Sequence, residues 1–307
     1  MASKGIQHGL ALVTVLWFIA LISILALGFS KSTRTDVAIA RNLLDGAQTR
    51  HLADAAIERA VMTLLDPQPE DEQAIMSGRA IPFNLGEAAV SYSIHSEQGK
   101  IDINQAPDML LQGLLLAIGL QQEQAASVAD AIIDWRDEND LRQLNGAERA
   151  EYQQARLGAG PSNAPFRSVA ELQQVMGIDS ELYRQMSPYV TVHSFIEQVN
   201  PQTAPKTVLL AIPGVNTSEV EVLIAAREAR DEGETVLGQL PVLTGVDEWT
   251  SNDTGNIYTI VATARLPSGA SFSREVTVLV SAGADLPYYL LDSRVASVDH
   301  SIGEQAE

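Results

Sequence analysis

The sequence contains no cysteine and has little positive charge. The lack of cysteine excludes disulfides, thiolate metal sites and cysteine nucleophiles, and it leaves the redox compartment undetermined. Lys and Arg total 20 against 39 Asp and Glu, so the formal net charge is −19. Proteins that bind DNA or RNA need clustered basic side chains to contact phosphates. This charge balance therefore argues against a nucleic-acid partner.

Recognisable catalytic motifs are also missing. No Gly-x-Ser-x-Gly, P-loop or His-Glu-x-x-His motif occurs, and the five histidines stand singly: His8, His51, His95, His193 and His300. We therefore do not expect an enzyme. A membrane-anchored enzyme is the alternative class, and turnover by the purified protein would reveal it.

A long apolar run is present near the amino terminus. Residues 10–29 contain no charged side chain, and as a helix they would span roughly 30 Å, the thickness of a bilayer's hydrocarbon core. A cleaved secretory signal is the alternative, but its apolar core is usually shorter, and no Ala-x-Ala site precedes Lys31. We expect a transmembrane anchor.

The chain after the anchor is predicted to continue as one helix. No proline occurs from Phe29 to Leu65, and apolar residues recur every three or four positions. One helix to about Leu65 would be roughly 80 Å long, and Pro67 would end it. Two helices that meet near Gly46 are the alternative.

Strand patterns lie far apart in the sequence. Residues 70–80 are expected to form a polar loop, and residues 88–94 alternate apolar and polar side chains, as in a half-buried strand. Two more strand patterns, at 257–262 and 273–280, flank Pro267-Ser268-Gly269 and predict a hairpin. Helical sequence separates the first strand from the hairpin. A helical insertion into a sheet domain explains this order.

The helical middle of the chain contains an internal repeat. Ala106-Pro107 and Ala204-Pro205 each precede a helix, a glycine turn and a second helix, and residues 171–178 form a looser third copy. These segments resemble the helix-hairpin-helix class, which binds DNA phosphates in some proteins. Acidic residues near the turns would repel phosphates, which favours a structural role: Glu123, Asp179, Glu181, Glu219 and Glu221.

An acidic stretch within this helical region is the candidate site. Residues 134–151 hold many carboxylates, which repel one another unless water or a cation separates them. Ca²⁺ prefers six to eight oxygen ligands in flexible geometry. Counted from Asp137, Glu148 stands at position 12 as in an EF-hand, but Leu141 and Arg142 occupy positions 5 and 6, so the loop is not one. A solvated acidic loop without metal is the alternative.

The amino terminus resembles the prepilin class. A short leader with Lys4 ends in Gly9 and is followed directly by the apolar run. The resemblance implies cleavage by a prepilin peptidase between Gly9 and Leu10 and methylation of the new terminus at Leu10. Most members carry Glu at the fifth mature position, where this chain has Thr14.

Further motifs resemble one subfamily, the large minor pseudopilin K of type II secretion systems. These motifs are residues 99–107, the acidic set followed by Gly146-Ala147-Glu148 and Tyr152, residues 166–172 and residues 188–192. Members of this subfamily bind calcium in the acidic loop. The resemblance implies a structural calcium ion here, held by Asp134, Asp137, Asn139, Asp140 and Glu148 and by the carbonyl of Leu141.

The resemblance also implies an α+β fold. It is the type IV pilin-like fold, a long amino-terminal helix packed on an antiparallel sheet, with a large inserted α-helical domain that contains helix-hairpin-helix or SAM-like repeats. The expected divisions are a leader at 1–9, a transmembrane segment at 10–29, the periplasmic part of the helix at 30–66, a pilin-like domain at 80–100 and 196–284, the inserted domain at 101–195 and a disordered tail at 285–307.

The implied function is that of a minor pseudopilin at the tip of the periplasmic pseudopilus, which initiates or caps it and supports export of folded proteins. The implied partners are other minor pseudopilins, the major pseudopilin, prepilin peptidase, the inner membrane and secreted substrates. A DNA-uptake or other pilus-associated protein is the alternative.

Lys31 and Arg34 after the span would place the body in the cytoplasm by charge alone, whereas the resemblance places it in the periplasm.

Overall fold

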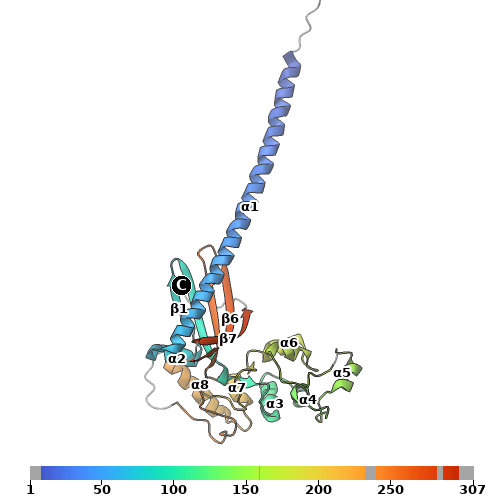
Figure 1. Ribbon diagram of the computed structural model, residues 1–307, viewed down its shortest axis with the longest axis vertical. Coiled ribbons are helices and arrows are strands. Elements are labelled where there is room, and N and C mark those ends of the chain that lie inside the picture. The colour runs from blue at the N-terminus through green and yellow to red at the C-terminus, as the bar shows by residue number, and fades with distance from the viewer. Residues whose placement is uncertain (1–7, 159, 232–239, 282–285, 297–307) are drawn as a thin grey trace, which may run out of the picture.

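The computed structural model describes residues 8–158, 160–231, 240–281 and 286–296. A long helix runs into a five-stranded antiparallel sheet, and a group of short helices lies beyond the far end of the sheet (Figure 1). This arrangement confirms the predicted mixture of a long amino-terminal helix with an antiparallel sheet.

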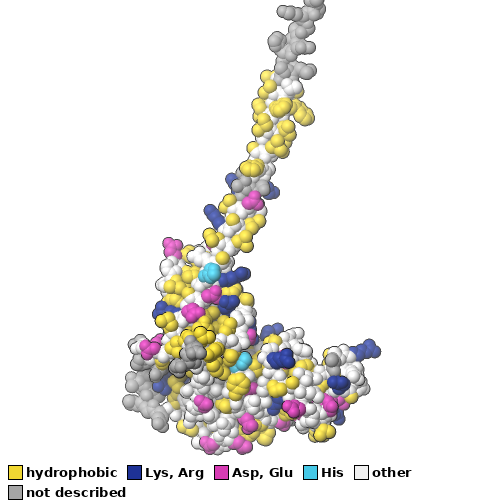
Figure 2. Space-filling view, viewed as in Figure 1, with side chains coloured by type: hydrophobic (Ala, Val, Ile, Leu, Met, Phe, Trp, Pro, Cys, Tyr) yellow, Lys and Arg dark blue, Asp and Glu magenta, His cyan; other side chains and the backbone are white. Residues whose placement is uncertain are grey.

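Helix α1 (His8–Leu65) is continuous over 58 residues and passes through Gly46 without a break. This confirms the prediction of one continuous helix, and the alternative of two helices that meet near Gly46 is wrong. Its first half stands clear of the body with exposed apolar side chains, among them Leu12, Trp17 and Phe29 at 68%, 76% and 77% exposure (Figure 2). It is the one helix in the described ranges that is long and apolar enough to cross a membrane.

The second half of α1 packs on the sheet through small side chains. Ala53, Ala56 and Ala60 are fully buried, and this one-turn spacing lets the helix lie close to the strands. Polar contacts at the edges of this packing fix the helix: Arg274 pairs with Asp54, Tyr288 donates to Glu58 at 2.7 Å, and the hydroxyls of Thr63 and Tyr92 lie 2.9 Å apart.

The sheet has the order β1-β2-β5-β6-β7, with all neighbours antiparallel. Its strands are β1 (Ile81–Leu85), β2 (Ala88–Ser96), β5 (Ile257–Arg265), β6 (Ser271–Val280) and β7 (Tyr288–Val295). Every second residue of β2 is buried, as its alternating pattern predicts. The β5–β6 hairpin also forms as predicted, and Gly269 adopts a φ of 89° in its turn.

Two expectations about single elements were wrong. Residues 70–80 are not a loop, because α2 (Pro69–Ser77) forms there, with proline in its first turn and Gly78 at a left-handed φ of 69° at its end. The tail expected from residue 285 contains strand β7, because the run Tyr288 to Leu291 pairs with the edge of β6. The rest of that tail, from residue 297, lies outside the described residues.

Short elements fill the chain between β2 and β5. These are η1 (Glu97–Gly99), β3 (Ile101–Asp102), α3 (Asp108–Ala117), α4 (Gln122–Arg136), α5 (Arg149–Ala155), η2 (Val169–Gln174), α6 (Ser180–Met186), β4 (Val190–Thr191), α7 (Lys206–Ala211) and α8 (Thr217–Asp231). Strands β3 and β4 pair in parallel, so the two ends of the segment between them meet at one place.

One hydrophobic core unites these helices, and it extends further along the chain than the expected boundary at 195/196. Residues 199–246 contribute Val208, Leu209, Leu223 and Val246 to the same core as α3 and α4. Helix α7 lies so close to α3 that a side chain at Gly113 would meet the Ala211 carbonyl oxygen at 1.9 Å. The described residues 199–231 and 240–246 therefore share their core with the helices rather than with the sheet.

Candidate functional site

The acidic loop returns onto α4 through two carboxylates that stand one helical turn apart. Asp134 accepts the backbone N–H of Gln143 at 3.0 Å, and Asp130 accepts the backbone N–H of Asn145 at 2.8 Å. Since positions i and i+4 lie on the same helix face, the pair binds alternate amides of the returning chain. The loop is thereby held against the helix at residues 143–145.

Glycine is required at the point of closest approach. A side chain at Gly146 would place its Cβ 2.1 Å from Oδ2 of Asp134 and 3.1 Å from the Asp130 carbonyl oxygen. Any other residue at this position would push the loop away from Asp134. Glycine is therefore needed at position 146 because there is no room for a side chain, and not because the backbone adopts a positive φ.

The outer part of the loop is built from local turns. Asp137 accepts the N–H of Asn139 at 3.2 Å, and Asn139 accepts the N–H of Leu141 at 2.7 Å. Asp140 accepts from the side-chain amide of Asn163 at 2.9 Å, which ties the loop to a segment 23 residues later. Asn139, Asp140 and Leu141 are exposed to solvent.

Glu148 lies at the inner end of the loop and carries an unusual carboxylate. The residue is 6% exposed, and neither carboxylate oxygen has a hydrogen-bond partner among the described residues. Its backbone N–H donates to Glu151 at 3.0 Å at the start of α5, which fixes its position. A buried carboxylate without partners is unfavourable unless a proton or a cation neutralises it.

The pKa values of Glu148 and Asp134 reflect their burial and the acidic side chains near them. Burial raises the pKa of the Glu148 carboxyl, and repulsion from Asp134, Asp137 and Asp140 raises it further. Burial also raises the pKa of Asp134; the hydrogen bond from Gln143 opposes this rise, and repulsion from Asp137 and Asp130 adds to it. Four of the predicted ligands are therefore close enough to affect one another.

The residues fit a hard cation by chemistry. The predicted ligands are all oxygen donors, and Glu148 supplies two buried oxygens with no other partner. Within the described ranges, however, no three His, Asp or Glu side chains converge as a ready metal cage. An ion would therefore have to draw the outer loop inward toward Asp134 and Glu148.

Sequence reasoning missed two features of this site. Asp130 was not among the candidates, although its spacing of four from Asp134 on a helix is visible in the sequence. Aromatic packing beneath the site also escaped notice: the ring centroid of Trp135 lies 6.0 Å from that of Phe166 in a stacked pair and 6.1 Å from that of Tyr152.

A second polar centre joins the sheet to the helices. Glu97 is 2% exposed and accepts from Lys100 at 2.6 Å, from Thr259 of β5 at 2.7 Å and from Thr191 of β4. Burial opposes ionisation of Glu97, but Lys100 and these hydrogen bonds outweigh it, so its pKa is lowered. One ionised side chain thus connects both parts of the body.

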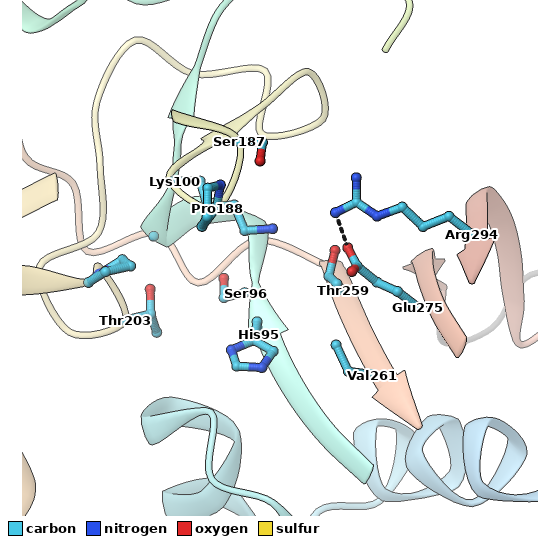
Figure 3. Close-up of a pocket in the computed structure, with 12 residues that line it drawn as sticks. His95, Ser96, Lys100, Ser187, Pro188, Thr203, Thr259, Val261, Glu275 and Arg294 are labelled. Atoms are coloured by element: carbon cyan, nitrogen blue, oxygen red, sulfur yellow. Dashed lines mark hydrogen bonds and ion pairs between the residues drawn. The ribbon is translucent and has the colours of Figure 1, made fainter. Parts of the chain in front are cut away.

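Beside this centre lies a cavity of about 300 Å³. Figure 3 shows His95, Lys100 and Thr259 around it, with Arg294 of β7 paired to Glu275 of β6 at 2.5 Å. Burial lowers the pKa of His95, and Lys100 lowers it further. Among the described lining residues, Arg294 is thus paired with Glu275, and Lys100 is paired with Glu97 behind the wall.

The predicted processing site lies at the start of α1. Gly9 and Leu10 belong to the helix, but their side chains lie outside the described residues. Thr14 is exposed on the same helix, five residues after Gly9. The structure places all three on the membrane half of α1, far from the acidic loop (Figure 1).

The sequence and the fold are similar to those of known proteins. The family model described as type II secretion system (T2SS), protein K, matches residues 82–194, from β1 to just beyond β4, and so includes the acidic loop. The chain is 25% identical over 247 residues to type II secretion system protein K of Klebsiella pneumoniae, covering 73% of this chain and 76% of that one. The protein K of Pseudomonas aeruginosa is 25% identical over 265 residues, covering 78% and 79%.

The fold is similar to that of a solved chain. The crystal structure of the GspK-GspI-GspJ complex from the enterotoxigenic Escherichia coli type 2 secretion system matches with a TM-score of 0.57 and 18% identity, covering 86% of this chain and 99% of that chain. This likeness concerns the fold alone. In sequence and in fold, the chain thus resembles type II secretion system protein K.

Proposed function

We propose that this minor pseudopilin occupies the tip of a periplasmic pseudopilus, where it initiates or caps the filament and supports export of folded proteins across the outer membrane. Its similarity to type II secretion system protein K supports a structural component of the secretion machinery and not an enzyme. The apolar half of α1 fits a single-pass anchor in the inner membrane. The body is proposed to lie in the periplasm.

The observation that carries this proposal is the position of the helical part. It is inserted between the neighbouring strands β2 and β5, at the end of the sheet opposite the anchor (Figure 1). Helices α3 to α6 extend sideways from the line of α1. A subunit stacked directly above would meet this mass, so the body favours a terminal place in the filament.

The anchor gives separate support. Thr14 stands where most pilin-like proteins carry a glutamate, and a hydroxyl cannot offer a carboxylate to the amino terminus of a neighbouring subunit. A subunit at the end of a filament needs one stacking contact fewer. The first proposed partners are other minor pseudopilins, in keeping with the complex in which the similar chain was solved. The others are the major pseudopilin, secreted substrates, and a prepilin peptidase that cleaves between Gly9 and Leu10.

Calcium is proposed as a structural ligand of the acidic loop. Asp134 and Glu148 would supply the inner oxygens, and Asp137, Asn139, Asp140 and the Leu141 carbonyl would supply the outer ones. Glu148 carries the argument, because both of its oxygens are buried without partners among the described residues. The ion would neutralise the acids and hold the loop closed.

The inserted helices and their glycine turns at Gly119 and Gly214 are proposed as helix-hairpin-helix repeats with a structural role.

Labelling of filaments tests the tip position. The full chain with an exposed epitope after Glu307 would be expressed with the other pseudopilins, and sheared filaments would be examined by immunogold electron microscopy. We expect label at one end of each filament. The same epitope on the major pseudopilin serves as the control and should label the whole length. Label along the filament sides for this chain would contradict a terminal position.

A further inference from the structure

A short segment after α5 lies beside the acidic loop and is fixed at both of its ends. We call residues 160–166 the strap. At its first end Gly160 packs on the start of α5, because a Cβ at Gly160 would lie 3.1 Å from Cα of Arg149, the residue that follows Glu148. The backbone of Gly160 adopts a φ of +104°, which favours glycine. The strap therefore begins beside the inner end of the loop.

The second end of the strap is Phe166, which is buried. Its backbone N–H donates to the side-chain oxygen of Asn104 at 2.8 Å, and its carbonyl accepts from the side-chain nitrogen of Asn104 at 2.9 Å. Its ring stacks on Trp135 of α4, with the centroids 6.0 Å apart. None of these contacts involves the loop between α4 and α5. The strap is therefore held in place independently of that loop.

Between its two ends the strap binds the loop through Asn163. The side-chain nitrogen of Asn163 donates to Oδ1 of Asp140 at 2.9 Å, and the Asp140 side chain is otherwise exposed. The side-chain oxygen of Asn163 is buried without a hydrogen-bond partner among the described residues. The backbone of Asn163 adopts a φ of +48°, a left-handed conformation that asparagine tolerates better than most residues. The amide is therefore oriented by its bond to Asp140.

This hydrogen bond opposes the repulsion between the outer and the inner acids of the loop. Burial raises the pKa of Glu148, and repulsion from acids that include Asp140 raises it further, so the two carboxylates are within electrostatic reach of each other. Like charges at such a range push the exposed Asp140 away from the buried Glu148. A neutral amide holds a carboxylate without adding charge. It leaves Oδ2 of Asp140, which accepts no hydrogen bond from the described residues, available to a cation.

We propose that Asn163 is a positioning residue for calcium, which holds Asp140 near Glu148 from a segment that is fixed outside the loop. This inference rests on the calcium site proposed above, whose ligands do not include Asn163. Without the amide, the ion itself has to bring Asp140 back against the repulsion from Glu148, and this cost lowers the affinity. Loss of a hydrogen-bond partner of a metal ligand typically weakens metal binding by about 10–100-fold.

Isothermal titration calorimetry of the full chain in detergent micelles with calcium chloride tests the proposal. Asn163→Gly removes the amide and still tolerates the positive φ. Ser162→Gly is the matched control, because Ser162 is an exposed residue of the same strap. We expect calcium to bind about tenfold or more weakly to Asn163→Gly and with unchanged affinity to Ser162→Gly. In excess chelator the two variants should have the same melting temperature. A lower melting temperature for Asn163→Gly there would indicate a structural role and count against positioning.

A double-variant cycle with Asp140→Ala shows whether Asn163 acts through Asp140. If it does, Asn163→Gly causes no further loss of calcium affinity in a chain that already carries Asp140→Ala. Fully additive losses would mean that the amide acts by another route and would overturn the proposal. Calcium binding that is unchanged by Asn163→Gly would overturn this inference alone, whereas no calcium binding by the unaltered chain would overturn the calcium site and this inference together.

Discussion

Asp134 and Gly146 are 12 residues apart in sequence, yet a Cβ on Gly146 would lie 2.1 Å from the Asp134 carboxylate. This contact places the inner end of the acidic loop against α4, and Glu148 follows two residues later with its carboxylate buried. Hydrogen bonds from the loop backbone to Asp130 and Asp134 of α4 therefore hold the inner end of the loop without an ion.

Gly146→Ala should destabilise the helical part. The added methyl group must displace the Asp134 carboxylate, and displacement breaks its hydrogen bonds to Gln143. We expect a loss of about 1–3 kcal/mol, measured as the free energy of unfolding in urea. Gly46→Ala is the control, since nothing lies within 4 Å of that position on α1. It should be neutral or stabilising by up to about 1 kcal/mol, and an equal loss in both variants would contradict the role of the contact.

Asp137→Ala and Asp130→Ala should respond differently to calcium. Asp137 is a proposed ligand, whereas Asp130 holds the chain at Asn145. Calcium at a hundred times its Kd adds roughly 2.7 kcal/mol to stability, which corresponds to several degrees in melting temperature. We expect Asp137→Ala to abolish most of the rise that calcium produces and to change little in excess chelator. Asp130→Ala should lower the melting temperature in both conditions.

The outcome of that melting experiment separates the two interpretations of the loop. A rise specific to calcium and absent from both Asp137→Ala and Glu148→Ala would establish the ion. The same melting temperature in calcium and in chelator for the unaltered chain would instead indicate a solvated acidic loop. Magnesium serves as the control ion, because it prefers smaller octahedral sites and keeps several waters.

Stability in chelator should fall as pH rises. The folded-state pKa values of Asp134 and Glu148 are raised above those of the unfolded chain, so their protonated forms are favoured by folding. Their contribution is complete below about pH 4, the unfolded range for Asp and Glu, and is lost as pH rises through the folded values. Melting temperatures from about pH 4 to pH 8 would measure the slope.

Glu148→Gln should flatten this pH dependence, because an amide does not titrate. It should also reduce the gain from calcium, which we expect to grow with pH as the carboxylates lose their protons. Glu97 contributes with the opposite sign, because its lowered pKa gives stability that is lost as pH falls. A steeper slope in Glu148→Gln than in the unaltered chain would refute the assignment.

Glu97→Gln should loosen the connection between the sheet and the helices. The change leaves the Lys100 ammonium, 17% exposed, without its partner, and weakens the hydrogen bonds from Thr259 and Thr191. Removal of one member of a buried ion pair typically costs about 3–5 kcal/mol. Urea unfolding would measure the loss. The double variant with Lys100→Met should recover part of it, and a purely additive double variant would argue against coupling of the pair.

Replacement of Gly9 with valine should block processing. A prepilin peptidase that requires glycine before the cleaved bond would leave the leader attached, and the anchor would still insert. Mass spectrometry of the membrane-extracted protein would give the mass of the chain from Met1 rather than from Leu10. Lys4→Gln, which keeps the glycine, is the control. A mature mass for the Gly9→Val protein would rule out cleavage at this site.

Much of the fold could be predicted from local pattern. The proline-free apolar repeat predicts α1 through Gly46, alternation predicts β2, and the Pro267-Gly269 turn predicts the β5–β6 hairpin. These signals are carried by residues close in sequence. The two missed elements lack such a pattern. Helix α2 is largely polar, so it has no clear apolar face. Strand β7 is exposed along nearly its whole length and forms because β6 offers an unpaired edge.

The sequence by itself determined the anchor, the long helix, the charge balance and the types of residue in the acidic loop, since composition and spacing suffice for each. Only the tertiary structure decided that residues 199–231 and 240–246 pack with the helices, that Asp130 and Asp134 hold the loop, and that Glu97 joins β4 to β5. These relationships link residues far apart in the chain. Burial and hydrogen bonding between such residues depend on how the elements pack, and no local pattern records that packing.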